Sequence, residues 1–147
     1  MPLNSTPDKL SIIIYDHHFD KVHYALVMAS AAAAIGKPVT LFFTMGACQA
    51  LLKTDRGVPP AWAEMPLSDE EGFGFERDQF YKKSGVAHFE ELLEACSALG
   101  VNFMVCEMGL RAKSLKTKTL RDNLNIEISG VVTFLHDASK DGAIIYI

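Results

Sequence analysis

Cys106 is the residue of this chain best placed to do chemistry. It directly follows the apolar run 101–105 and precedes the turn 107–110. If that run is a buried strand and a helix follows it, the thiol lies at the carboxyl end of a strand, near a helix amino terminus. Backbone N–H groups there favour an anion, and the thiolate is the nucleophilic form of cysteine. The position predicts a reactive sulfur, although it is equally compatible with a cysteine that only packs in the core.

The two other cysteines carry weaker chemical signals. Cys96 falls on the apolar stripe of a predicted helix, where a free cysteine commonly acts as a small buried hydrophobe. Cys48 lies a few residues inside another predicted helix, so we expect it to pack, and we keep it as a possible secondary thiol. Three cysteines cannot all pair within one chain, and their spacing matches no zinc motif. At least one thiol should therefore be free.

Basic residues are concentrated just after Cys106. In a chain with a net charge of −4, this local surplus could attract an anionic substrate or an acidic partner and favour a thiolate. A solvated helix face explains the same pattern. Glu107 opposes a thiolate unless its carboxylate points away. The basic residues, five of the 14 in the chain, are Arg111, Lys113, Lys116, Lys118 and Arg121.

Two adjacent histidines, His17 and His18, follow the first predicted strand and could supply a base or metal ligands. No third ligand with clear spacing accompanies them, so we predict no metal site and expect surface or capping histidines. The chain also lacks the GxGxxG, GxxxxGK[ST] and GxSxG motifs. A nucleotide-dependent enzyme is therefore disfavoured, and no cofactor is expected.

Short β-branched runs alternate with helical patterns along the chain. Strand–helix–strand units place their strands parallel. The fold class is therefore α/β, with an open five-stranded parallel sheet of flavodoxin-like type and helices on both faces. The predicted strands are residues 10–15, 39–43, 101–105, 126–128 and 143–147. The predicted helices are residues 21–35, capped by Asp20, a short helix through 48–52, then 89–99, the helix-permissive segment 110–124, and 131–138.

An open parallel sheet binds its ligands outside the carboxyl ends of its strands. Cys106 lies at such an end, and we predict that it is the catalytic thiol. Other residues of its turn, and residues after the first two strands, should face the same edge of the sheet. The predicted substrate-binding residues are Met108, Gly109, Arg111, Gly46 and His17.

One long segment, residues 54–86, interrupts the strand–helix alternation. It contains two adjacent prolines, the single tryptophan Trp62 and the sequence GFGF at 72–75. A structureless loop of that length is unusual in a compact domain. We interpret the segment as an excursion inserted within a single domain of residues 1–147. It should contain a short helix, cover a site as a lid or join an interface, and a variable surface loop is an equally good interpretation.

Length, charge and hydropathy exclude several classes of protein. A chain of 147 residues with 49% apolar composition fits one domain with a substantial core. Its acidic balance gives no case for binding nucleic acid. Residues 1–7 lack the features of a secretion signal, and the longest apolar stretch, 24–35, is shorter than the about 20 residues that span a bilayer. We expect a soluble cytoplasmic protein that does not bind membranes.

Four segments together carry a family resemblance: 11–16, FFTMG at 42–46, FEELLEACSALGVNFMVCEMGL at 89–110 and GVVTFL at 130–135. They resemble the DsrE/DsrF-like (DsrEFH) sulfur-relay family over nearly the whole chain except 54–86. The most specific part is a helix ending in ALGV, a strand, and a cysteine followed by EMGL. Cys48 and the segment with Trp62 and GFGF are departures from the pattern.

The resemblance implies assembly into homotrimers or homohexamers and a cysteine that carries sulfur as a persulfide or thiosulfonate. Cys106 matches that cysteine. Some subunits of the family lack it and are structural, so its presence favours a carrier. The implied partners are inorganic sulfur species, such as thiosulfate or polysulfide, and a small sulfur-carrier protein.

We therefore expect an intracellular sulfur carrier or sulfurtransferase subunit that accepts sulfur on Cys106. The alternative is a non-catalytic oligomer subunit, or a small-ligand binding module with the Trp62 segment as its lid. A thiol peroxidase is less well supported, because neither Cys48 nor Cys106 is preceded by the PxxxTxxC arrangement of peroxiredoxins.

Overall fold

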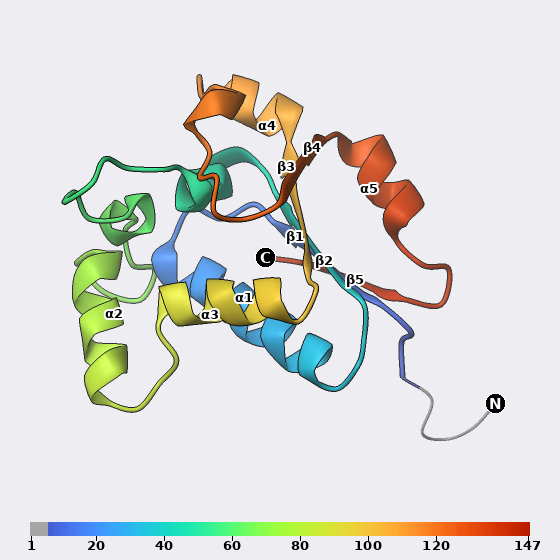
Figure 1. The fold of residues 1–147 in the computed structure, drawn as a ribbon, viewed down its shortest axis with the longest axis horizontal. Helices are drawn as coiled ribbons and strands as arrows, with labels where there is room; N and C mark the ends of the chain where they lie inside the picture. The colour runs from blue at the N-terminus through green and yellow to red at the C-terminus, as the bar shows by residue number, and fades with distance from the viewer. Residues whose placement is uncertain (1–5) are drawn as a thin grey trace.

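Five short parallel strands form an open sheet through the centre of the molecule (Figure 1). The computed structural model describes residues 6–147. Residues 1–5, which contribute to the prediction of no secretion signal, lie outside the described residues. Every neighbouring pair of strands is parallel, which confirms the predicted sheet. The strands are β1 (Leu10–Ile14), β2 (Val39–Phe43), β3 (Asn102–Cys106), β4 (Ile126–Ser129) and β5 (Ala143–Tyr146).

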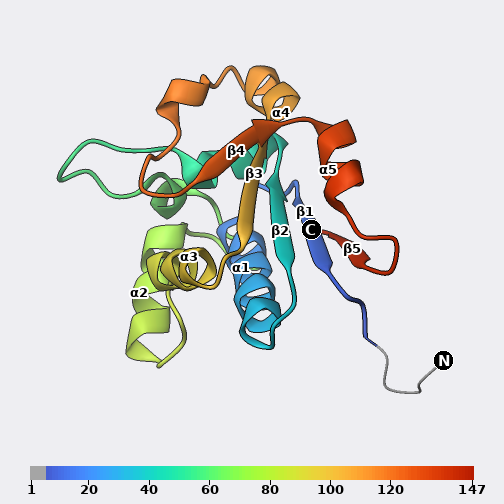
Figure 2. The ribbon, with the colours of Figure 1, turned by 45° about the vertical axis from the view of Figure 1, so that its right-hand side comes forward.

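The two faces of the sheet carry different side chains, because successive residues of a strand point to opposite faces. On one face, Leu41 and Phe103 belong to a large core shared with helices α1 and α3. On the other face, Phe42 and Met104 pack with Phe134 of helix α5. Figure 2 shows α1 and α3 on one side of the sheet and α5 on the other. No helix within residues 6–147 is long and apolar enough to cross a membrane. The helices that cover the two faces of the sheet are α1 (Phe19–Ala34), α3 (Phe89–Ala98) and α5 (Val131–Asp137).

The strand order is β4-β3-β2-β1-β5, so the chain reverses its direction across the sheet at β1. The first four strands follow one another toward one edge. The connection after β4 then returns across the sheet and places β5 on the other side of β1. Open α/β sheets hold ligands where the strand order reverses, which here is between β1 and β5.

Helix α1 begins earlier than the sequence predicts, because the expected cap has another role. His18 occupies the N-cap position, and Asp20 lies within the first turn. The Asp20 carboxylate accepts hydrogen bonds from the backbone N–H of Ser68, at 2.7 Å, and from the Ser68 hydroxyl. The side chain that resembles a helix cap in the sequence therefore anchors the distant segment 54–86.

The segment 54–86 folds into two helices that pack on the core. Trp62 is 5% exposed, and its ring lies 4.9 Å from that of Phe89. The buried carboxylate of Asp78 accepts a hydrogen bond from the N–H of Phe89, the first residue of α3, at 2.8 Å. The segment is therefore an integral part of the fold, and its role as a lid stays a prediction. Its helices are η2 (Ala61–Glu64), a 3₁₀ helix, and α2 (Gly74–Lys83).

The helix after Cys106 starts earlier and ends sooner than the predicted segment 110–124. It is α4 (Glu107–Ala112), and a short 3₁₀ turn, η3 (Thr117–Thr119), follows it. Beyond α4 the backbone pairs with the chain that follows β2: the N–H of Lys53 donates to the carbonyl of Thr119, and the N–H of Arg121 to that of Leu51, both at 2.8 Å. These tertiary hydrogen bonds replace the helical ones that the polar sequence would permit.

Acidification should destabilise the fold through His23, a buried residue of α1. Its Nε2–H donates to the carbonyl of Ala87 at 2.8 Å. Burial lowers the pKa of His23 from its ordinary value of 6.5, and the hydrogen bond and the carboxylates of Asp78 and Asp20 oppose this change. Below pH 6.5 the unfolded chain therefore binds more protons than the folded one. Stability is complete above that pH and is lost as the pH falls toward the folded pKa.

His23→Gln, which keeps a donor for the Ala87 carbonyl, should cost about 1–2 kcal/mol near neutral pH but flatten the pH dependence between about pH 7 and 5. Urea denaturation at several pH values measures this slope. His136→Gln, at an exposed site, should keep the wild-type slope. Equal slopes for wild type and His23→Gln would contradict the prediction.

Candidate functional site

The carboxyl ends of β1, β2 and β3 are held together by glycine contacts. A Cβ on Gly46 would lie 2.6 Å from the Cβ of His17, so only glycine lets these two backbones approach so closely. A Cβ on Gly109 would lie 2.6 Å from the backbone nitrogen of Met45 and 2.7 Å from Oγ1 of Thr44. Three residues that the sequence assigns to the site, His17, Gly46 and Gly109, are thus brought to one edge of the sheet.

Met45 is strained at the centre of this edge. It opens the 3₁₀ helix η1 (Met45–Leu51) with a φ of 49°, in the left-handed region that non-glycine residues rarely adopt. Such a conformation costs of order 1–3 kcal/mol and persists only where the surroundings enforce it. Here the close contact with Gly109 fixes its backbone nitrogen. The sequence contains no signal that would have identified Met45.

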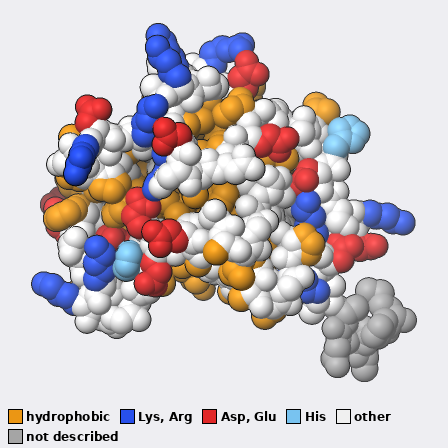
Figure 3. Space-filling view, viewed as in Figure 1, with side chains coloured by type: hydrophobic (Ala, Val, Ile, Leu, Met, Phe, Trp, Pro, Cys, Tyr) orange, Lys and Arg blue, Asp and Glu red, His pale blue; other side chains and the backbone are white. Residues whose placement is uncertain are grey.

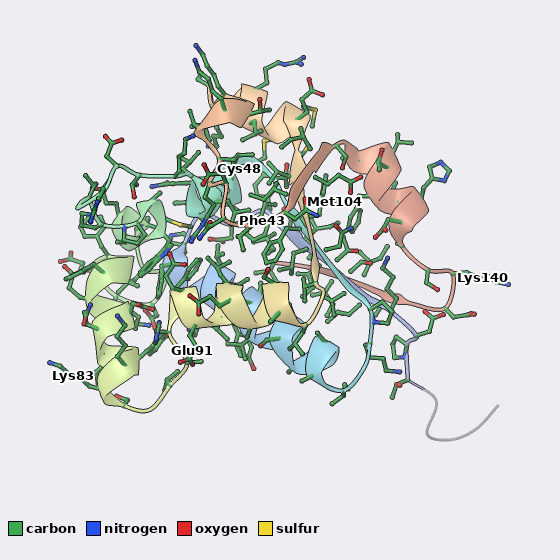
Figure 4. The ribbon with its side chains drawn as sticks, viewed as in Figure 1. Phe43, Cys48, Lys83, Glu91, Met104 and Lys140 are labelled. Atoms are coloured by element: carbon green, nitrogen blue, oxygen red, sulfur yellow. The ribbon has the colours of Figure 1, made fainter. Side chains whose placement is uncertain are left out.

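Cys106 is both the last residue of β3 and the N-cap of α4, as the sequence suggests. Its Sγ accepts a hydrogen bond from the N–H of Gly109 at 3.4 Å. The side chain is 0% exposed and packs with Phe42, Met104 and Phe134 on the α5 face of the sheet. Met104 is labelled in Figure 4, on β3 beside β4 and α5. The thiol therefore has a donor for a thiolate but no direct access from solvent in this conformation.

Ser129 is a further polar group of this site. It pairs in register with Cys106 across the β3–β4 ladder, so the two side chains project from the same face of the sheet. Its Oγ is buried and has no hydrogen-bond partner among the described residues. An unpaired buried hydroxyl costs free energy unless a ligand or water meets it. The sequence places Ser129 at a strand end, but only the register reveals that it is the neighbour of Cys106.

The outer surface of α4 carries the remaining residues of the predicted turn. Glu107 forms an exposed ion pair with Arg111, with 2.7 Å between Oε1 and Nη2. Its carboxylate therefore points away from the buried thiol, which answers the objection raised by its position in the sequence. Met108 is 59% exposed. Met108 and Arg111 thus lie on the solvent side of α4, whereas Gly109 lies on its packed side.

Cys48 lies inside η1, labelled in Figure 4, and is fully buried. Its Sγ is 3.8 Å from the carbonyl oxygen of Phe43. Burial, together with the nearby thiol of Cys106, raises the pKa of Cys48 to about 12, although Lys113 opposes the change. Burial likewise raises the pKa of Cys96 to about 12. Both thiols stay protonated near neutral pH, which disfavours a nucleophilic role for either.

A pocket of about 460 Å³ opens at the same edge of the sheet, on the side of η1. His17 and Gly46 line it, together with Lys53, Lys113 and Glu64. Its volume falls within the range of small-molecule sites, and its wall is largely apolar with a few charged groups. Cys106 does not line it, so the structure separates the buried thiol from the pocket. The sequence identified neither lysine as part of a pocket.

Lys and Arg side chains gather over α4 and the segment that follows it, at the top of Figure 3. Arg121 is an exception, because its guanidinium binds the carboxylate of Glu90 at 3.0 Å. Lys113, Lys116 and Lys118 are exposed. The basic segment predicted from the sequence thus forms a positively charged surface next to α4.

Comparison with known proteins supports a single family assignment. The model of the DsrE/DsrF-like family matches residues 9–146. The uncharacterized protein YrkE of Bacillus subtilis is 26% identical over 156 residues, which cover 95% of this chain and 96% of the relative. The sulfur carrier protein DsrE2 of Allochromatium vinosum is 28% identical over 159 residues, which cover 95% and 98%.

Two solved structures share the fold. The YchN protein of Escherichia coli superposes with a TM-score of 0.58 at 17% identity, covering 95% of this chain and 99% of that one. MTH1491 of Methanobacterium thermoautotrophicum gives a TM-score of 0.56 at 13% identity, covering 95% and 98%. Identities this low support the fold alone.

The contact at Gly109 can be tested by adding a single methyl group. Gly109→Ala should destabilise the protein by about 1–3 kcal/mol, because backbone atoms must move to admit the Cβ. This holds even though alanine normally gains about 1 kcal/mol over glycine within a helix. Gly130→Ala is the matched control, since nothing lies within 4 Å of its Cβ. Urea denaturation measures both, and equal losses would show that the contact at Gly109 is not tight.

Proposed function

The chain belongs to the DsrE/DsrF-like family, and we propose that it is a sulfur carrier in which Cys106 accepts sulfane sulfur and passes it to a partner thiol. The observation that carries the proposal is the environment of the Cys106 Sγ. It accepts a hydrogen bond from the N–H of Gly109, and its strand neighbour Ser129 has a buried hydroxyl with no hydrogen-bond partner within residues 6–147. The similarity to a protein named as a sulfur carrier supports the same function.

The chemistry needs one nucleophile and two donors. The Cys106 thiolate attacks the terminal sulfur of a polysulfide, one S–S bond forms, and the polysulfide leaves as a dianion shorter by one sulfur. With thiosulfate, the S–S bond breaks and sulfite leaves. In either case the product is a cysteine persulfide anion, and charge is conserved. The N–H of Gly109 and the hydroxyl of Ser129 would stabilise the negative sulfur in both states.

Access to the sulfur requires a local opening. Because Cys106 is 0% exposed, packs with Phe134 of α5 and caps α4, a sulfur donor reaches it only when one of these two helices moves away from it. Both helices are short, with six and seven residues, so a local opening costs far less than unfolding the domain. The exposed lysines after α4 would draw an anionic donor or an acidic carrier protein to this opening. Met108 and Arg111 on the exposed side of α4 would contact that donor.

An apolar surface on the α5 side supports assembly with further copies of the chain. Val132 is 69% exposed and Leu135 55% on α5, and Tyr146 is 65% exposed on β5. Tyr146 pairs in register with Ile13, which packs with the α5 cluster, so these residues belong to one face. Contiguous exposed apolar groups of this kind mark interfaces. We therefore expect a homotrimer or homohexamer to use this face.

Two other features bear on the proposal. The described cysteines are all free, which fits the reduced thiols of the cytoplasm.

The 460 Å³ pocket, separate from Cys106, favours a second candidate function, a binding module for a small anionic ligand held by Lys53 and Lys113. In that case Cys106 would be a structural residue. The two functions differ in whether the native thiol reacts.

Sulfur loading tests the carrier function. Incubation of the native protein with polysulfide should add one sulfur atom at Cys106, detected by mass spectrometry of the intact chain and of its peptides. Cys106→Ser should abolish the addition, and Cys96→Ser, which removes an equally buried thiol of α3, should leave it unchanged. Ser129→Ala should reduce loading by roughly 5- to 30-fold, the effect of one lost hydrogen bond of about 1–2 kcal/mol.

No addition to the wild-type protein, or addition that persists in Cys106→Ser, would exclude the carrier function. If Cys106 also resists a small thiol reagent in the native state, the binding-module function is the better explanation.

Assembly is tested by placing a charge on the apolar face. Val132→Glu should convert the oligomer to monomer, because a carboxylate at the centre of an apolar interface loses its hydration. Ile35→Glu is the matched control, since Ile35 is 76% exposed at the end of α1, away from this face. Light scattering coupled to gel filtration measures the mass of each. A monomeric wild type would rule out the proposed interface.

A further inference from the structure

Three residues directly after β1, Asp16, His17 and His18, point donor atoms toward one another. One carboxylate oxygen and one ring nitrogen of each histidine all lie within 4.8 Å of one another. The two imidazole rings are adjacent, with 4.2 Å between their centroids and their planes tilted by 35°. The set contains two imidazoles and one carboxylate, the donor combination that late first-row divalent metals prefer. The mechanism proposed for Cys106 uses none of these donor atoms.

The place of this cluster in the fold also favours a ligand site. Asp16 to His18 follow β1 at the point where the strand order reverses between β1 and β5. The backbone N–H groups of Tyr15 and Asp16 donate to the carbonyl of Ile147, which fixes the start of the cluster against the end of β5. On one side His17 lines the 460 Å³ pocket. On the other side Asp16 lines a second pocket, between α1 and β5.

We propose that Asp16, His17 and His18 form a three-ligand site for a Zn²⁺-class divalent metal ion, with a fourth position open toward the pocket lined by His17. Three protein ligands and one open position are the arrangement of zinc sites that bind an exchangeable ligand. The neighbouring side chains of Lys53 and Lys113 would favour a small anion at that position. The inference is independent of the sulfur-carrier function, because the two sites share no residue that binds sulfur or metal directly.

Closing around a metal changes the present spacing, in which the three donor atoms lie within 4.8 Å of one another. In a tetrahedral zinc site with bonds of about 2.0 Å, donor atoms lie roughly 3.3 Å apart. Nδ1 of His18 and Oδ1 of Asp16 are closer, at 2.6 Å, because they share a hydrogen bond. Metal binding replaces this hydrogen bond and moves the pair apart by about 0.7 Å. The side chain of His17 is exposed and those of Asp16 and His18 are half-buried, so none of the three is locked in the core.

Backbone contacts restrain the positions of Asp16, His17 and His18. The N–H of His18 donates to Oδ1 of Asp16 at 2.7 Å, so the carboxylate is held over the turn. Gly46 packs directly against the Cβ of His17, which restricts the position of that side chain. His18 is the N-cap of α1 and begins a helix of 16 residues. The ligands thus project from a rigid turn between a buried strand and a long helix.

Zinc titration of the tag-free, reduced protein tests the proposal. Isothermal calorimetry should give one Zn²⁺ per chain for the wild type. His17→Ala and His18→Ala should each raise the Kd by more than roughly tenfold, because even outer partners of zinc ligands are worth 10–100-fold. Asp16→Asn should raise it at least about tenfold for the same reason. His136→Ala, which removes an exposed histidine of α5, should leave the Kd unchanged.

Cobalt distinguishes this site from binding by the cysteines. Co²⁺ should give the intense visible bands of a four-coordinate nitrogen and oxygen site, without thiolate charge-transfer absorption, and the spectrum should be the same in Cys106→Ser. Circular dichroism confirms that each variant is folded. The proposal is overturned if the wild type binds no Zn²⁺, if both histidine variants keep the wild-type Kd, or if binding is lost in Cys106→Ser.

Discussion

The close approach of α4 to the end of β2 at Gly109 is the contact on which the rest of the site depends. Because no Cβ separates Gly109 from Met45 and Thr44, α4 can begin immediately after β3 and lie across the sheet edge. This makes Cys106 a strand end and a helix cap at once. It also brings the N–H of Gly109 onto the sulfur. A bulkier residue at position 109 would move α4 outward and separate these groups.

The same packing divides the edge of the sheet into two chemical environments. On the α5 face, a thiol and a serine hydroxyl are buried among apolar side chains, with a single backbone donor on the sulfur. On the opposite side of η1, His17 and two lysines line an open pocket. A soft nucleophile is shielded from water in the first environment. Charged and imidazole groups remain accessible in the second, so one edge can support two kinds of ligand.

Burial of Cys106 connects the dynamics of the domain to its proposed function. A persulfide exposed to solvent loses its sulfur readily to other thiols, so a carrier gains from shielding it between transfers. The short helices α4 and α5 would make this shielding reversible in the proposed carrier, whereas the α1 and α3 side of the sheet is densely packed. The stable and the adaptable parts of the molecule therefore lie on opposite faces of one sheet.

The order and type of most elements follow from the sequence, because apolar periodicity and glycine stops are local properties. The five strands, the helices α1, α3 and α5 and the place of Cys106 before a helix could all be predicted in this way. The predictions from sequence are wrong where distant segments of the chain form hydrogen bonds with the same backbone or side-chain groups. Asp20 binds Ser68 in place of capping α1, and the backbone near Lys53 and Arg121 pairs in place of extending α4.

The sequence by itself determined the fold class and the family, and it singled out Cys106 as the candidate sulfur. Only the tertiary structure decided that this sulfur is buried, that Ser129 is its neighbour and that Asp16 lies beside the histidine pair. The strand register, the close approach of α4 to the end of β2 and the reversal of strand order are relations between segments far apart in the chain. No local pattern of residues encodes them, so the surroundings of Cys106 and His17 become visible only when the sheet is assembled.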